Sequence, residues 1–86
     1  MSARKTFEKL RSGNRNIAFR DLLGLAEAFG FSVVRISGSH HILKHSSLPE
    51  MLNFQAVRGD AKPYQVRQLL QLVERYGLKL DREGSA

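Results

Sequence analysis

Histidine is the side chain best suited to proton transfer near neutral pH, and this chain places one directly after a tight turn. His40 follows Ser37-Gly38-Ser39, and a β-type run of residues lies on each side of this segment. Glycine in a short hairpin turn takes the positive φ angle that such turns need. Backbone N–H groups at such a turn can hold an anion such as a phosphate. The segment therefore combines a group that moves protons with donors that would bind phosphate.

The other two histidines are predicted to lie on the opposite side of the same strand. In a strand over 40–45, alternation places His40 with Lys44 on one face and His41 with His45 on the other. At most two histidines therefore share a face, and the chain contains no cysteine. Because zinc is held by three or four such ligands, these histidines are not expected to form a metal site.

Two amphipathic helices and a three-stranded sheet are predicted to position this turn. Apolar residues recur every three or four positions from Ile17 to Phe29, and a last helix begins near Pro63. The strands between these helices are predicted over 31–36, 40–45 and 51–57. This order predicts an α+β domain of two layers, with the helices on one face of an antiparallel sheet and the other face free for a partner.

The chain is predicted to divide into three regions. A short helix over 3–11 gives an N-terminal arm of residues 1–16, residues 17–80 form the domain, and residues 81–86 form a frayed tail. The formal net charge is +6, which favours a nucleic-acid partner. Most of the excess lies in residues 1–20, and it would also attract an acidic protein. The lack of cysteine, of a signal peptide and of a long apolar run favours a cytoplasmic protein.

The segment Gly38-Ser39-His40-His41-Ile42, which closes a hairpin after Phe29-Gly30-Phe31, resembles the HicA toxins of bacterial HicBA toxin–antitoxin pairs. The resemblance extends from Ile17 to Leu80 in motif, spacing and order of elements. It implies an α-β-β-β-α fold like that of double-stranded-RNA-binding domains, here preceded by a short extra helix. It also implies an mRNA interferase, a cytoplasmic endoribonuclease that needs no metal or other cofactor. A HicB-type antitoxin would neutralise this toxin in a hetero-oligomeric complex.

The resemblance also implies which residues form the site. His40 matches the histidine that the family uses catalytically, and it would act as a general base or acid. Gly38 and Ser39 would shape the turn and offer hydrogen-bond donors. Lys44, on the same strand face as His40, and Lys62, at the start of the last helix, would contact phosphate.

One position departs from the family pattern and leaves an alternative open. Many HicA members carry a second histidine in the third strand, where this chain reads Asn53-Phe54-Gln55. Glutamine does not relay protons at neutral pH, so His40 would work with a lysine or water, or activity would be reduced. The alternative is a non-catalytic RNA-binding module of the same fold. A duplex-binding module should carry a basic cluster where only Lys62 and Arg67 are present, which favours the enzyme.

Overall fold

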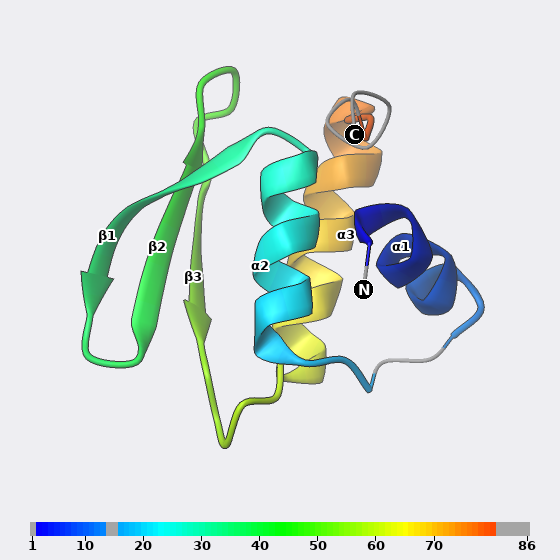
Figure 1. Cartoon of the computed structure of the whole chain (residues 1–86). Coiled ribbons are helices and arrows are strands. Elements are labelled where there is room, and N and C mark those ends of the chain that lie inside the picture. The colour runs from blue at the N-terminus through cyan, green and yellow to red at the C-terminus, as the bar shows by residue number, and fades with distance from the viewer. Residues whose placement is uncertain (1, 14–15, 81–86) are drawn as a thin grey trace.

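The computed structural model describes residues 2–13 and 16–80 of the chain. Its elements are α1 (Ala3–Arg11), α2 (Phe19–Ala28), β1 (Phe31–Ser37), β2 (His40–His45), β3 (Met51–Gln55) and α3 (Pro63–Tyr76). The three strands pair antiparallel in the order β1-β2-β3, and the helices lie on one face of this sheet (Figure 1). From α2 onward this is the order of double-stranded-RNA-binding domains, so the predicted α+β fold class is confirmed.

The core lies between the sheet and the helices. Alternate side chains of the three strands face the helices and are almost completely buried: Phe31, Leu43, Leu52 and Phe54. The apolar stripes of α2 and α3 close over them, and their fully buried members include Leu22, Leu25, Val66 and Leu69. Burial of one such side chain contributes about 1.5–3 kcal/mol, so these contacts dominate the stability of the two layers.

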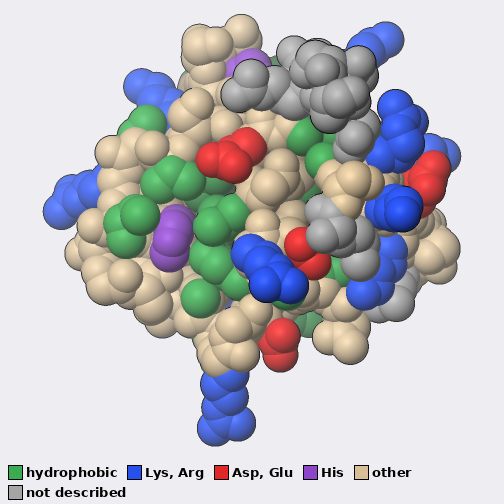
Figure 2. Space-filling view, in the orientation of Figure 1, with side chains coloured by type: hydrophobic (Ala, Val, Ile, Leu, Met, Phe, Trp, Pro, Cys, Tyr) green, Lys and Arg blue, Asp and Glu red, His purple; other side chains and the backbone are tan. Residues whose placement is uncertain are grey.

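The N-terminal helix α1 packs on α2, on the side away from the sheet (Figure 1). The rings of Phe7 and Phe29 meet edge to face with their centroids 5.3 Å apart. Leu10 is 1% exposed and belongs to the same buried cluster as the strand residues. Lys and Arg side chains gather over this helix in Figure 2, so these cations lie across the helices from the sheet.

A bulge at Val34 decides which side chains of β1 reach each face of the sheet. Val34 is an extra residue between the pairs Val33–Leu43 and Arg35–Ile42. Because side chains alternate between faces, a regular strand would have turned Arg35 toward the helices together with Val33. The bulge instead places Arg35 on the same face as Ile42, which points away from the helices.

The third strand is shorter than the predicted range 51–57, and that prediction is wrong at its end. After β3, Val57 forms an isolated bridge with Asp60 across a two-residue turn. The φ angles of that turn are both positive, 54° at Arg58 and 80° at Gly59, as in a type I′ hairpin turn. Val57 therefore belongs to this small turn rather than to the ladder with β2.

Helix α2 begins two residues later than predicted because Ala18 is its extended N-cap residue and backbone hydrogen bonds hold the residues on either side. The carbonyl of Ile17 accepts a hydrogen bond of 3.1 Å from the backbone N–H of Ala61. The N–H of Phe19 donates one of 2.8 Å to the carbonyl of Gly59. These bonds tie the start of α2 to the segment that leads into α3. β1 also extends one residue beyond the predicted range, through Ser37.

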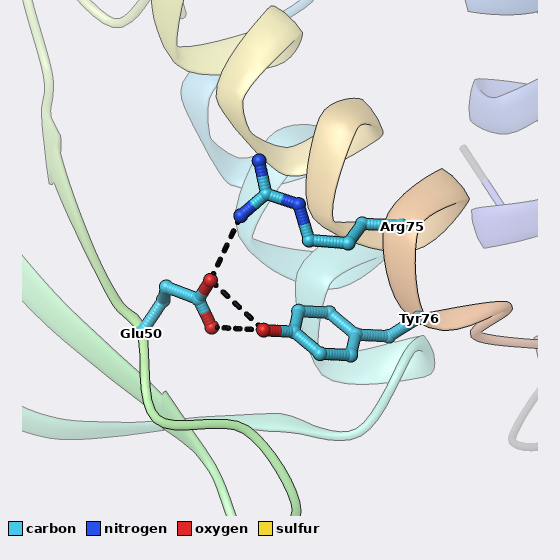
Figure 3. Close-up of polar contacts among 3 residues, drawn as sticks. All are labelled: Glu50, Arg75 and Tyr76. Atoms are coloured by element: carbon cyan, nitrogen blue, oxygen red, sulfur yellow. Dashed lines mark hydrogen bonds and ion pairs between the residues drawn. The ribbon is translucent and has the colours of Figure 1, made fainter.

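A carboxylate joins the end of α3 to the start of β3. Glu50, directly before β3, accepts hydrogen bonds of 2.8 and 2.9 Å from the hydroxyl of Tyr76 (Figure 3). It also forms an ion pair with Arg75, with 2.9 Å between the guanidinium nitrogen and the carboxylate oxygen. The contact fixes the far end of α3, whereas the site described below lies at the near end.

The predicted frayed tail, residues 81–86, lies outside the described residues. Within the described ranges, none of the helices combines the length and the apolar character needed to cross a bilayer.

Candidate active site on the open face of the sheet

The face of the sheet opposite the helices carries His40, and we call it the open face. It is crossed by three rows of paired residues, one from each strand: Ser37–His40–Gln55, Arg35–Ile42–Asn53 and Ser32–Lys44–Met51. Except for Ile42 and Gln55, which are partly buried, all of these residues are exposed. The open face thus carries hydrogen-bonding side chains at one end and a lysine at the other.

The predicted hairpin turn is confirmed, and it brings His40 next to Gln55. Gly38 and Ser39 form the two-residue loop between the paired residues Ser37 and His40. Gly38 has a φ of 60° and Ser39 has no positive φ, which is the pattern of a type II′ turn. The side-chain amide of Gln55 donates a hydrogen bond of 3.2 Å to Oγ of Ser39. This bond holds the turn against the end of β3.

His40 is exposed at the start of β2, and a neighbouring amide contacts its ring. Nδ1 of His40 lies 3.1 Å from Oδ1 of Asn53, which projects from the next row of the open face. Gln55 lies directly opposite His40 in the ladder with β3. The structure therefore groups His40, Ser39, Asn53 and Gln55 at one end of the sheet.

His41 and His45 lie on the covered face, as the alternation predicts. The ring of His41 meets Phe19 edge to face at 5.0 Å between centroids, and that of His45 meets Phe31 at 5.2 Å. Both rings are partly buried and pack on the core. In the described part of the chain, no three His, Asp or Glu side chains come together as a set of metal ligands.

The two predicted lysines lie on different elements of the fold. Lys44 shares the open face with His40, but Ile42 separates them, and their Cα atoms lie about 13 Å apart along the strand. Lys62 is the N-cap residue of α3, and its Nζ lies 5.9 Å from the centre of the Tyr64 ring. Gly38, Ser39 and His40 are thus adjacent, whereas Lys44 is remote and Lys62 belongs to a neighbouring element.

Two residues of the open face were not among the predicted site residues. Asn53 touches the ring of His40, and Arg35 lies on β1 in the row between His40 and Lys44. Asparagine is depleted in strands, so an Asn in the middle of β3 was the one sequence signal for the first of them. Nothing local marks Arg35, because its face depends on the bulge at Val34.

Comparison with known proteins identifies a family but no individual relative. No curated protein and no solved structure matches the chain significantly. Residues 19–74 match the protein family described as HicA toxin of bacterial toxin-antitoxin. The matched range runs from the first residue of α2 into α3, so it contains the whole sheet and the open face. Because it spans more than half of the 86 residues, the chain belongs to the HicA toxin family of bacterial toxin–antitoxin systems.

Proposed function

We propose that this toxin is an mRNA interferase, an endoribonuclease that cuts mRNA and thereby stops translation, with His40 as its catalytic residue. The observation that carries the proposal is the position of His40 within the family-matched range. It is exposed on the open face, its Nδ1 is engaged by Asn53, and Arg35 lies one row away. A histidine in this setting can exchange protons with a bound RNA.

The chemistry uses the 2′-hydroxyl that distinguishes RNA from DNA. His40 takes the proton of this hydroxyl, and the 2′-oxygen attacks the adjacent phosphorus. A new 2′-O–P bond forms, the bond from phosphorus to the 5′-oxygen breaks, and the leaving oxygen takes up a proton. The products are a cyclic phosphate and a 5′-hydroxyl. No metal takes part in these steps, because histidine supplies the proton transfer and nearby donors balance the charge on phosphate.

The proposed phosphate contacts fall into three groups. Gly38 and Ser39, in the turn beside His40, would offer donors to the phosphate under attack. Arg35 and Lys44 follow along the open face and would hold the next phosphates of the strand. Lys62, the N-cap residue of α3, would give a third contact beyond the end of β3, where Gln65 of the same helix binds the carbonyl of Gln55. This arrangement suits a single strand laid across the sheet, whose bases can splay out from the backbone.

Water or a lysine, rather than a second histidine, would deliver the proton to the leaving oxygen. Gln55 lies directly opposite His40, so a histidine at this position would have faced His40 across one strand pair. Glutamine can hold a phosphate oxygen by its N–H group but does not donate a proton at neutral pH. A solvent-exposed site leaves water free to protonate the leaving oxygen.

A toxin–antitoxin family implies a cognate antitoxin, and we assign to it the open face and the edge of β1. Among the described residues β1 pairs only with β2, and Val34 and Ile36 on it are 57% and 61% exposed. Exposed apolar edge strands are normally covered or interrupted by charge. Ile36 pairs with His41 and so lies on the face opposite His40. A HicB-type antitoxin would therefore have to wrap around the edge of β1 to bury Ile36 while it covers the open face and blocks access to His40.

Growth arrest in cells tests the assignment of His40. The His40→Ala variant should be harmless when expressed without antitoxin, because the exposed ring contributes little to the core. Lys5→Ala, on the exposed side of α1, should arrest growth as the parent does. Growth arrest by the His40→Ala variant at the parent's expression level would show that His40 is not the catalytic residue.

A further inference from the structure

We propose that Asn53 is a positioning residue that holds His40 in the tautomer protonated on Nδ1, so that Nε2 is the atom that accepts the substrate proton. The catalytic consequence rests on the function proposed above. The tautomer of His40 is independent of that function, because it can be measured on the protein without RNA.

A close contact joins the side chains of His40 and Asn53. Nδ1 of His40 and Oδ1 of Asn53 are 3.1 Å apart, within hydrogen-bonding distance. An amide oxygen can only accept a hydrogen bond, so Nδ1 of His40 must donate it. In a neutral imidazole the other nitrogen then carries the free electron pair. The contact therefore makes Nε2 the basic atom, at the outer end of an exposed ring.

The pairing of β2 with β3 places Asn53 next to His40. Asn53 is the pair partner of Ile42, so it lies diagonally from His40 on the same face. Diagonal neighbours on a sheet lie within reach of long or planar side chains. Gln55, the direct partner of His40, is instead engaged by Ser39 in the turn. The two amides of β3 thus act on different groups, one on the turn and one on the ring.

The other histidines of β2 supply an internal comparison. Nδ1 of His45 accepts a hydrogen bond of 3.0 Å from the backbone N–H of Ser47, which puts the proton of a neutral His45 on Nε2. Nδ1 of His41 lies 3.2 Å from the carbonyl of Ser39, which puts its proton on Nδ1. His40 should therefore resemble His41 and differ from His45.

Nitrogen NMR of the imidazole rings tests the tautomer, using the uniformly labelled full chain above the pH at which histidines become neutral. In the parent, His40 should carry its proton on Nδ1 and His45 on Nε2. Asn53→Asp should keep the His40 tautomer, because a carboxylate also accepts from Nδ1. Asn53→Leu should let it become mixed, with His45 unchanged in each variant. If His40 of the parent carries its proton on Nε2, the amide of Asn53 is flipped and donates from Nδ2 to the ring, and the proposal fails. The proposal also fails if His40 keeps the same tautomer in Asn53→Leu.

The pH dependence of RNA cleavage gives the functional readout. The charged groups that share the open face with His40 are Arg35 and Lys44, and β3 contributes only neutral side chains there. A carboxylate at position 53 would stabilise the imidazolium form, so Asn53→Asp should move the acidic limb of the kcat profile to higher pH.

Asn53→Leu should lower kcat with little change in KM. The loss should be about tenfold, less than the 10²–10⁴-fold that a general base contributes, because the base is still present. An unmoved acidic limb in Asn53→Asp would contradict the positioning role. If the parent does not cleave RNA, the proposed function fails, and the NMR result still decides whether Asn53 sets the tautomer.

Discussion

The side-chain amide of Gln65 donates a hydrogen bond of 3.2 Å to the backbone carbonyl of Gln55, joining the first turn of α3 to the last residue of β3. The same side chain is fully buried, and its oxygen lies 3.4 Å from the backbone N–H of Lys62. Gln55 is in turn the ladder partner of His40. One buried glutamine therefore ties the helix that carries Lys62 to the strand that supports His40.

Replacing Gln65 should destabilise the protein. Gln65→Leu leaves the carbonyl of Gln55 and the N–H of Lys62 without their partner in a partly buried setting, which should cost about 1–3 kcal/mol in the free energy of unfolding. Urea denaturation measures this loss. The same change at Gln68, an exposed position of α3, should stay within about 0.5 kcal/mol of the parent. Equal effects at both positions would show that the buried amide contributes nothing specific.

Glu50 should make the stability of the protein depend on pH. The hydrogen bond from Tyr76, helped by Arg75 and partly opposed by desolvation, holds the pKa of Glu50 below its ordinary value of 4.5. Since this carboxyl binds protons less readily in the folded state, its contribution is present above the unfolded pKa and is lost as pH falls through the folded pKa. The bond to Glu50 raises the pKa of Tyr76 above 10.0, so the tyrosine contribution is lost at alkaline pH.

The matched variant for this effect is Glu50→Gln, which keeps an acceptor for Tyr76 but removes the charge. From neutral pH down to about 4.5 the parent should be the more stable protein, and the difference should shrink as the pH falls further. Chemical denaturation at a series of pH values measures both curves. A constant difference across the acidic range would contradict the lowered pKa.

Salt dependence should reveal which cations touch RNA. If Arg35 and Lys44 each neutralise a phosphate of a single strand, each change to Ala should reduce the slope of log affinity against log salt by about 0.7. Lys5→Ala, on the far side of the helices, should leave the slope unchanged. Fluorescence anisotropy on a labelled single strand, with the non-cleaving His40→Ala protein as background, gives the slopes. If the slope falls in Lys5→Ala and not in the Arg35 and Lys44 variants, the RNA binds at α1 and not on the open face.

Antitoxin binding should depend on the exposed edge of β1. Ile36→Lys places a charge on a side chain that the proposed complex buries, and it should weaken the binding of the cognate antitoxin about tenfold or more. Gln71→Lys adds the same charge at an exposed position of α3 and should bind as the parent does. Calorimetric titration compares the two. Equal affinities would place the antitoxin elsewhere on the surface.

Local chemistry was sufficient to predict the hairpin and the face of each β2 residue. The turn needs a positive φ at Gly38, and glycine is the residue that adopts this conformation most readily, so its position predicts the turn. The alternation of β2 separates His40 from His41 and His45 by geometry alone. Which face the helices cover could not be read from β2, because both of its faces mix polar and apolar residues. Contacts with other strands decide it, since Leu43 pairs with the buried Leu52.

The residues that support His40 depend on strand register, which has no local signal. Asn53 reaches His40 only because β3 pairs with β2 so that Ile42 lies opposite Asn53. Arg35 reaches the open face only because Val34 is an extra residue in β1. A shift of one residue in either pairing would reverse these faces. The predicted end of the third strand at Val57 is wrong for a similar reason, because Val57 pairs with Asp60 and not with a residue of β2.

The most direct test of the account is cleavage of a labelled single-stranded mRNA by the purified chain in EDTA, beside the His40→Ala variant. We expect the parent to cut the RNA and the variant, with an unchanged unfolding midpoint, to be slower by about 10²–10⁴-fold. If neither protein cuts but both bind the RNA, the chain is a binding module of this fold. Equal cutting by both proteins would remove His40 from the chemistry.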